Sequence, residues 1–292
     1  MTQIINDDQG NSITEFPNVG GKRTMPVVYL DTNGNPVLTI PVSIADTITA
    51  TISGKVEVKD RATEVVVGNI DGITYIEKFG RNTAVASGVQ ETIWDGSTIY
   101  AWPTSASITH IVSTNGGDTM QIEVQGLDGN FALVTQTITL TGTTQKLLAT
   151  PLRRVFRAKV LGSVATLGIV KISNLGQAVV YAQITVGANQ TNMALYTIPA
   201  GKTGYLKKWY ASILRSSGVT AVAADVDIFR REFGGVFRST QPVGIQNTGM
   251  GSWQYQFPYP LALPEKTDIA VRAIPTAAAD ISAGFTIELR DN

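Results

Sequence analysis

The stretch MQIEVQGLDGNFALVTQTITL, residues 120–140, decides the fold. In its first arm, Met120, Ile122 and Val124 alternate with polar residues. Side chains of a strand point alternately to opposite faces, so this pattern predicts a strand with one apolar face. The second arm repeats the pattern, with an apolar face formed by Ala132, Val134, Ile138 and Leu140. The stretch therefore predicts a β-hairpin that covers a core on one side.

The centre of this stretch has the composition of a tight turn. Asp128, Gly129 and Asn130 lie between the two arms, and these residue types accept positive φ at low cost. We therefore expect the hairpin to reverse at Asp128–Asn130.

Composition indicates a strand-rich protein and excludes several kinds of chemistry. Charged residues make up 16% of the 292 residues, and 23 basic side chains balance 23 acidic ones. A net charge of zero provides no global field to attract nucleic acid or an anionic membrane. The chain has no cysteine and one histidine, which excludes disulfides, thiolate chemistry and histidine-rich metal sites.

Alternating segments separated by turn signals continue along most of the chain. Their spacing of about 8–12 residues is typical of antiparallel sandwiches or barrels. We count VVVGN at 65–69 and STIYAW at 97–102 among these strand-like segments, and no helix longer than a turn or two is expected. The predicted fold is all-β: an extended N-terminal arm over residues 1–60, a β-sandwich over 61–185 and a second, jelly-roll-like sandwich over 186–292.

Residues 1–60 differ from the rest of the chain in composition and in hydrophobic patterning. The first part is polar and weakly patterned, and PVSIADTITATISGKVEVKD at 41–60 alternates in short runs. Short alternating strands seldom close a core alone, and they are common where several copies bury one another's apolar edges. The alternatives are a disordered tail and an ordinary edge sheet on the next domain. The polar, acidic start does not resemble a signal peptide, and no apolar run approaches the ~20 residues that cross a bilayer.

Two groups of aromatic residues are candidates for the core or for binding. Trp94, Tyr100 and Trp102 are expected to close one end of a core; the sharper alternative is a sugar-stacking platform. The segment Gly244–Pro264 is expected to be a long loop. Within it, four aromatic residues share parity, so an extended loop would present them on one side as a binding surface: Trp253, Tyr255, Phe257 and Tyr259.

Catalytic and metal motifs are incomplete. YTIPAGKT at 196–203 ends like a phosphate-binding loop but lacks its first glycine, so it predicts a hairpin turn. DTNGNP at 31–36 has proline where a calcium loop needs glycine. Asp225 and Asp227 are expected on a solvent face, although they could share a cation. His110 is the only histidine, and the sequence has no G-x-S-x-G nucleophile elbow with which it could form a serine triad. We predict no enzyme activity and no cofactor, while a pair of carboxylates that converge in space stays open.

Arg153, Arg157 and Lys159 have the spacing to form a basic stripe along a strand. Contact with nucleic acid is one interpretation. An intersubunit salt-bridge face is the alternative, and the zero net charge favours it.

Four phrases resemble a recurrent set of tailed-phage virion proteins, familiar from marine and freshwater phages including cyanophages. They stand in order between Lys78 and Leu206: residues 78–106 (KFGRNTAVASGVQETIWDGSTIYAWPTSA), 124–144 (VQGLDGNFALVTQTITLTGTT), 151–160 (PLRRVFRAKV) and 195–206 (LYTIPAGKTGYL). The N-terminal phrase at 41–60 also resembles β-stalks of phage fibres and decorations.

The resemblance implies a β-rich, non-catalytic structural component of the virion, assembled in the host cytoplasm. Its expected partners are other virion proteins, such as the major capsid protein or neck and tail proteins. The stalk-like phrase favours a homo-oligomer, specifically a trimer. A capsid decoration or cement protein is the leading hypothesis; the alternatives are a neck or tail component and a receptor- or glycan-binding module.

Overall fold

The computed structural model describes residues 60–215, 222–247 and 250–292, together with four short strands of the N-terminal segment. Those strands are β1 (Ile4–Asn6), β2 (Ser12–Thr14), β3 (Tyr29–Leu30) and β4 (Pro36–Val37), and they pair antiparallel as β1 with β2 and β3 with β4. The chain divides into two compact units, residues 1–59 and 60–292. Most of the expected arm and the DTNGN residues at 31–35 lie outside the described residues.

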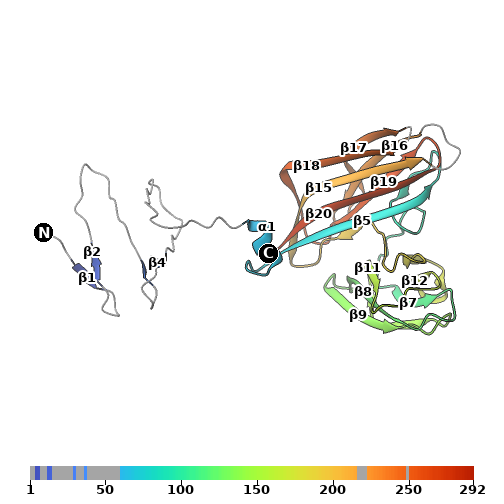
Figure 1. Cartoon of the computed structure of the whole chain (residues 1–292), viewed down its shortest axis with the longest axis horizontal. Helices are drawn as coiled ribbons and strands as arrows, with labels where there is room; N and C mark the ends of the chain where they lie inside the picture. Colours follow the sequence, from blue (N-terminus) through green and yellow to red (C-terminus); the bar gives the residue numbers. More distant parts are fainter. Residues whose placement is uncertain are drawn as a thin grey trace. The chain divides into compact units, whose positions relative to one another are not determined.

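A sandwich that we call the terminal sandwich contains the last strands of the chain. One sheet has the order β18-β15-β20-β5, which Figure 1 shows as long neighbouring strands. The facing sheet has the order β14-β19-β16-β17, with β6 beside β19. The bounds are β5 (Ile73–Val85), β6 (Glu91–Thr92), β14 (Leu195–Thr197), β15 (Lys202–Arg215), β16 (Val222–Arg231), β17 (Arg238–Asn247), β18 (Met250–Leu263), β19 (Asp268–Pro275) and β20 (Ala279–Asp291). Side chains of both sheets fill one core around Trp209 and Phe285.

A second sandwich, the inserted sandwich, lies in the sequence between β6 and β14. Its sheets have the orders β10-β7-β12-β13 and β11-β8-β9. The bounds are β7 (Ile108–Ser113), β8 (Gln121–Leu127), β9 (Leu133–Thr139), β10 (Lys146–Leu152), β11 (Arg154–Val160), β12 (Val170–Ser173) and β13 (Val180–Ile184), with a short 3-10 turn η1 (Leu175–Gln177). Its core includes Ile122 and Val124 from one sheet and Ile111 and Ile172 from the other. The all-β class with antiparallel sandwiches is confirmed.

The hairpin predicted over residues 120–140 forms as β8 and β9, paired antiparallel with Ile122 opposite Ile138. Its turn differs in detail from the prediction. Asp128 accepts hydrogen bonds from the backbone N–H groups of Asn130 (2.8 Å) and Ala132 (2.9 Å). In this turn the residue with positive φ is Phe131 (φ 65°). It directly follows residues 128–130, whose residue types tolerate this conformation best. The Phe131 ring is 2% exposed, so burial of the ring offsets the backbone strain.

One expected strand is a helix. Residues 65–67 of VVVGN lie at the end of α1 (Arg61–Val66) and directly after it. Asp60 caps this helix by accepting the backbone N–H of Thr63 at 2.9 Å, which favours the helix start over an extended chain. STIYAW at 97–102 also forms no strand.

Two segments predicted as a loop or a hairpin turn have other structures. Gly244–Pro264 contains the end of β17 and all of β18, which pairs with β15 over residues 250–256 and 261–263 with a register shift between them. The turn at 198–201 joins β14 to β15, but these strands lie in different sheets, so no hairpin forms there.

Sheet pairing divides the chain differently from the expected boundaries at 61–185 and 186–292. Strand β5 falls within the first expected domain, yet it pairs with β20 along almost its whole length. The terminal sandwich therefore needs strands from both sides of the insertion. Alternation within β5 cannot reveal this, because it does not identify the partner strand.

Candidate functional site at the junction of the two sandwiches

A buried ion pair joins the two sandwiches. Arg154 begins β11 of the inserted sandwich, and Asp268 begins β19 of the terminal sandwich. The guanidinium donates from Nε to Asp268 Oδ1 at 2.8 Å and from Nη2 to Oδ2 at 3.0 Å. Its Nη1 donates to the carbonyl oxygens of Pro103 (2.6 Å) and Arg153 (2.9 Å). Both side chains are almost fully buried, at 6% and 4% exposure, so the pair forms in a site with little water.

Asp268 also contacts two other strands of the terminal sandwich. Its Oδ1 accepts from Thr197 Oγ1 of β14 at 2.6 Å, and its Oδ2 accepts from Nε of Arg231 of β16 at 3.0 Å. One carboxylate therefore faces two guanidinium groups, which leaves a surplus of positive charge in the junction.

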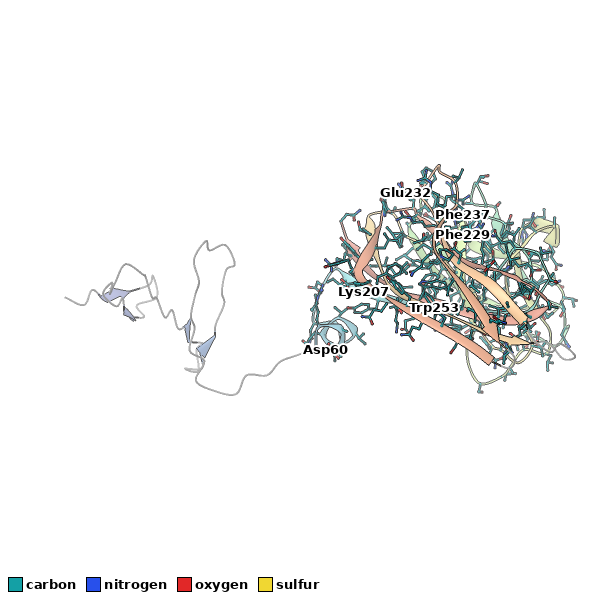
Figure 2. The ribbon with its side chains drawn as sticks, turned by 90° about the horizontal axis from the view of Figure 1, so that it is seen from above. Asp60, Lys207, Phe229, Glu232, Phe237 and Trp253 are labelled. Atoms are coloured by element: carbon teal, nitrogen blue, oxygen red, sulfur yellow. The ribbon has the colours of Figure 1, made fainter. Side chains whose placement is uncertain are left out.

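Aromatic faces surround the surplus charge. The Arg231 guanidinium lies 4.5 Å from the Phe237 ring centroid and 5.5 Å from that of Trp102. Arg272 lies 4.3 Å from Phe237 and 4.7 Å from Phe229, two rings that Figure 2 labels close together. Cations over ring faces are stabilised by the ring quadrupole, more so where water is scarce. The junction is therefore an arginine–aromatic cluster.

Further contacts cross the junction. Ala200 donates its backbone N–H to the Phe131 carbonyl at 2.9 Å. The Phe156 ring packs against Tyr196 with centroids 4.7 Å apart, and Lys78 Nζ donates to the Phe156 carbonyl. Strand β19 is buried on both faces near this point: Ile269 and Val271 belong to the terminal core, and Ala270 to the inserted core. The two sandwiches thus share a continuous packed interface.

The predicted basic stripe has different members. Lys159, Arg157 and Arg154 lie opposite Glu123, Gln125 and Leu127, which alternate by two along β8. Arg154, not Arg153, therefore shares the face of Arg157 and Lys159. The reason is a one-residue bulge at Phe156, which shifts the parity of β11. Lys159 pairs with Glu123 of the same chain at 3.1 Å, and Arg153 lies over the Phe131 ring at 4.5 Å.

The predicted aromatic row lies on edge strand β18. Trp253, Tyr255 and Phe257 are half-buried and pack against the terminal core. Trp253 meets Trp209 at 4.6 Å and stacks parallel to Tyr255 at 5.8 Å. Of these four aromatic residues, only Tyr259 is largely exposed, at 88%. Ring contacts join Trp253, Tyr255 and Phe257 into one row, which helps to close its own sandwich.

The remaining sequence candidates occupy structural positions. Trp94 and Tyr100 are buried in the inserted core, and Trp102 packs beside them. Asp225 is exposed opposite buried Val226, as predicted for a solvent face. The His110 Nδ1 lies 2.8 Å from Thr109 Oγ1.

Within residues 60–215, 222–247 and 250–292, no group of three or more acidic or histidine side chains could hold a metal ion. The same part of the chain has no helix long and apolar enough to span a membrane.

Sequence reasoning missed Asp268, Arg231 and Thr197. Asp268 is separated by 114 residues from Arg154 and by 37 from Arg231. No local pattern connects them. A weak signal was available: Arg154 stands in LRRVF at the start of an apolar strand, where a charged side chain needs a buried partner.

Comparisons with known proteins give no family. No family model matches the chain, and no curated protein matches it. Among solved structures, the subviral particle of infectious bursal disease virus VP2 matches with 9% identity and a TM-score of 0.18, over 81% of this chain and 79% of that one. The structure of the Gx strain of that virus matches with 10% identity and a TM-score of 0.18, over 75% and 76%. Overlaps at this TM-score establish neither a shared fold nor a shared function.

Proposed function

We propose that this chain is a non-enzymatic structural protein of a tailed-phage virion, bound to the capsid as a decoration or cement protein. Its partners would be other virion proteins, with the major capsid protein first among them. The chain would act as a homo-oligomer, with a trimer favoured by the stalk-like N-terminal phrase.

One observation carries this proposal: the phrases that resemble virion proteins meet at the junction of the sandwiches. Arg154 from residues 151–160 and Thr197 from 195–206 both bind Asp268. Phe131 from 124–144 bonds Ala200, and Gly80 from 78–106 packs against the backbone at Ala194. The resemblance thus maps onto residues that hold two sandwiches together.

This arrangement suits a mechanical role. Two sandwiches joined by a buried ion pair, aromatic packing and backbone bonds form a stiff body, as a protein that bears load on a particle requires. The carboxylate of Asp268, which binds both Arg154 and Arg231, already accepts from three side chains. A structural role uses all of these contacts, whereas acid–base chemistry would require a carboxylate open to substrate.

The alternative sites on the virion are the neck and the tail, and the alternative activity is adhesion to a receptor or glycan. Adhesion through the aromatic row is less favoured, because Trp253, Tyr255 and Phe257 pack against their own core. Tyr259 alone offers a free ring face.

The test is to mix the purified protein with phage shells that lack it and to image the mixture by cryo-electron microscopy. A decoration protein occupies regular positions on the capsid lattice. Density at the portal or tail alone would move the protein to the neck or tail. Shells and tails without added density, combined with binding to host cells, would support adhesion and contradict the capsid role.

A further inference from the structure

A groove runs beside strand β5, away from the junction's ion pair. Its volume is about 970 Å³, and it is lined by α1, by the outer face of the β5–β20–β15 sheet and by Arg157 and Thr191. Lys207, which Figure 2 labels, lines it together with Asp60. Its lining includes five cationic side chains and two carboxylates: Arg61, Lys78, Arg157, Lys207 and Lys208, with Asp60 and Glu77.

Three of the five cations have acidic partners within the chain. Lys207 and Arg61 contact the buried carboxylate of Glu288 at 3.1 and 3.4 Å. Lys208 lies 3.6 Å from Glu77. Lys78 and Arg157 differ, because neither forms an ion pair with any described residue.

Lys78 and Arg157 both line the groove and lie close enough for their charges to interact. Lys78 is 9% exposed, and its ammonium reaches the carbonyl of Phe156, the neighbour of Arg157. Arg157 donates from Nη2 to Gln190 at 3.3 Å, while its buried Nε meets no acceptor within the described chain. Burial and, to a smaller extent, the nearby Arg157 charge together lower the pKa of Lys78 to about 7. A buried and a half-buried cation without a counter-charge favour an anion between them.

The backbone beside this pair is a free sheet edge. β5 is the last strand of its sheet, and at Gly80 the backbone of Ile93 and Ala194 packs against one face of the strand. Before Gly80, over residues 73–79, the described chain supplies β20 as the only strand partner. Such an edge presents unpaired N–H and C=O groups to an incoming strand.

We propose that this groove binds an extended acidic segment of a partner polypeptide, which adds as a strand to residues 73–79 and places a carboxylate between Lys78 and Arg157. The main-chain bonds along the edge supply affinity, and the cation pair selects for acid. The partly exposed Phe79 and the exposed Val66 provide apolar contacts beside the charges. Such a segment could bind here whether or not the protein belongs to a virion.

A nucleic-acid strand is the main competitor for a basic groove. It is disfavoured because the neighbouring cations already contact carboxylates of the chain: Lys159 contacts Glu123, Lys208 lies near Glu77, and Lys207 shares Glu288 with Arg61 and Arg290. A backbone of phosphates needs a continuous row of free cations, whereas one carboxylate needs only the Lys78–Arg157 pair.

The test measures binding of a labelled peptide that alternates glutamate with valine and threonine, by fluorescence anisotropy with the full chain. We expect saturable binding that weakens with salt, and at least about tenfold weaker binding to Arg157→Gln. Lys146→Gln, an exposed change on β10 outside the groove, is the matched control and should bind as the unchanged protein does. The same glutamate peptide with N-methyl groups on alternate residues keeps its charge and should lose binding, because it cannot pair along the edge.

Three results would overturn the proposal. The first is that a matched lysine peptide binds as tightly as the glutamate peptide. The second is that Arg157→Gln binds the glutamate peptide as tightly as the unchanged protein does. The third is that the glutamate peptide does not bind at millimolar concentration. Tighter binding of an oligothymidylate than of the glutamate peptide, lost in Arg157→Gln, would assign the groove to nucleic acid instead.

Discussion

Arg154 and Asp268, which are 114 residues apart in the sequence, form a two-point ion pair between the two sandwiches, with donor–acceptor distances of 2.8 and 3.0 Å. The pair is buried, and Arg231 and Thr197 complete the hydrogen bonding of the carboxylate. Because desolvating two charges is costly, such a pair contributes specificity of docking more clearly than net stability. It joins the first residue of β11 to the first residue of β19.

Removing the carboxylate should destabilise the fold strongly. Asp268→Asn leaves Arg154 and Arg231 facing each other in a buried site, so we expect a loss of about 3–5 kcal/mol in the free energy of unfolding. The matched control is Asp280→Asn, which breaks the surface pair with half-exposed Arg81 and should cost about 1 kcal/mol or less. Urea denaturation measures the free energy of unfolding of both variants. Equal losses for Asp268→Asn and Asp280→Asn would show that the junction ion pair contributes no more than a surface pair.

Phe131 should reverse the usual order of alanine and glycine. Both substitutions remove a ring that is 2% exposed, so each should cost about 3–5 kcal/mol. Glycine accepts φ 65° without strain, whereas alanine does not. We therefore expect Phe131→Gly to be more stable than Phe131→Ala by about 1 kcal/mol. A more stable alanine variant would contradict the observed turn geometry.

Gly80 should tolerate no side chain. A Cβ there would lie 2.2 Å from the backbone nitrogen of Ala194 and 2.3 Å from the carbonyl oxygen of Ile93, so two backbone segments would have to separate. We expect Gly80→Ala to lower the free energy of unfolding by about 1–3 kcal/mol or more. Gly116→Ala meets nothing within 4 Å and should change stability by less than about 0.5 kcal/mol. Thermal unfolding of Gly80→Ala and Gly116→Ala measures the two changes in stability. Equal changes would contradict the close backbone contacts at Gly80.

The buried Lys78 should make stability depend on pH. Its pKa in the folded chain is about 7, below the usual 10.5, so between these values the unfolded chain binds more protons. The free energy of unfolding should therefore rise as pH increases from 7 towards 10.5, by up to about 1.4 kcal/mol per pH unit. Below about pH 7 the Lys78 contribution should level off, because both states then carry the proton.

Lys78→Met provides the control for this pH dependence. The difference in unfolding free energy between the unchanged protein and Lys78→Met should shift in favour of the unchanged protein as pH rises from 7 to 9. Parallel pH profiles for the two proteins would show that Lys78 keeps its charge throughout.

The sequence predicts local strands well and their partners poorly. Alternation in residues 120–140 identifies the hairpin because one face of each arm meets a core. The same reasoning fails at β11, where the bulge at Phe156 shifts parity without leaving a mark in the residue types. It also fails at Gly244–Pro264, where glycine and proline suggest a loop but β18 forms along β15, an edge position that tolerates proline.

The site depends on long-range topology. Alternating basic residues indicated that β11 carries cations, and Arg157 is among the groove residues. The sequence does not place Asp268 at the junction or Lys78 in the groove. Both positions depend on β5 and β19 reaching β11, which happens only when the terminal sandwich closes around the insertion. Nothing in the local spacing of these residues encodes that closure.

The virion role is tested most directly by the copy number of this chain in purified particles. Quantitative mass spectrometry of gradient-purified phage measures it relative to the major capsid protein, before and after a high-salt wash. We predict a fixed ratio that recurs between preparations and withstands the wash, as for a protein bound at regular capsid positions. Absence from particles, or a trace amount that varies between preparations, would contradict the account.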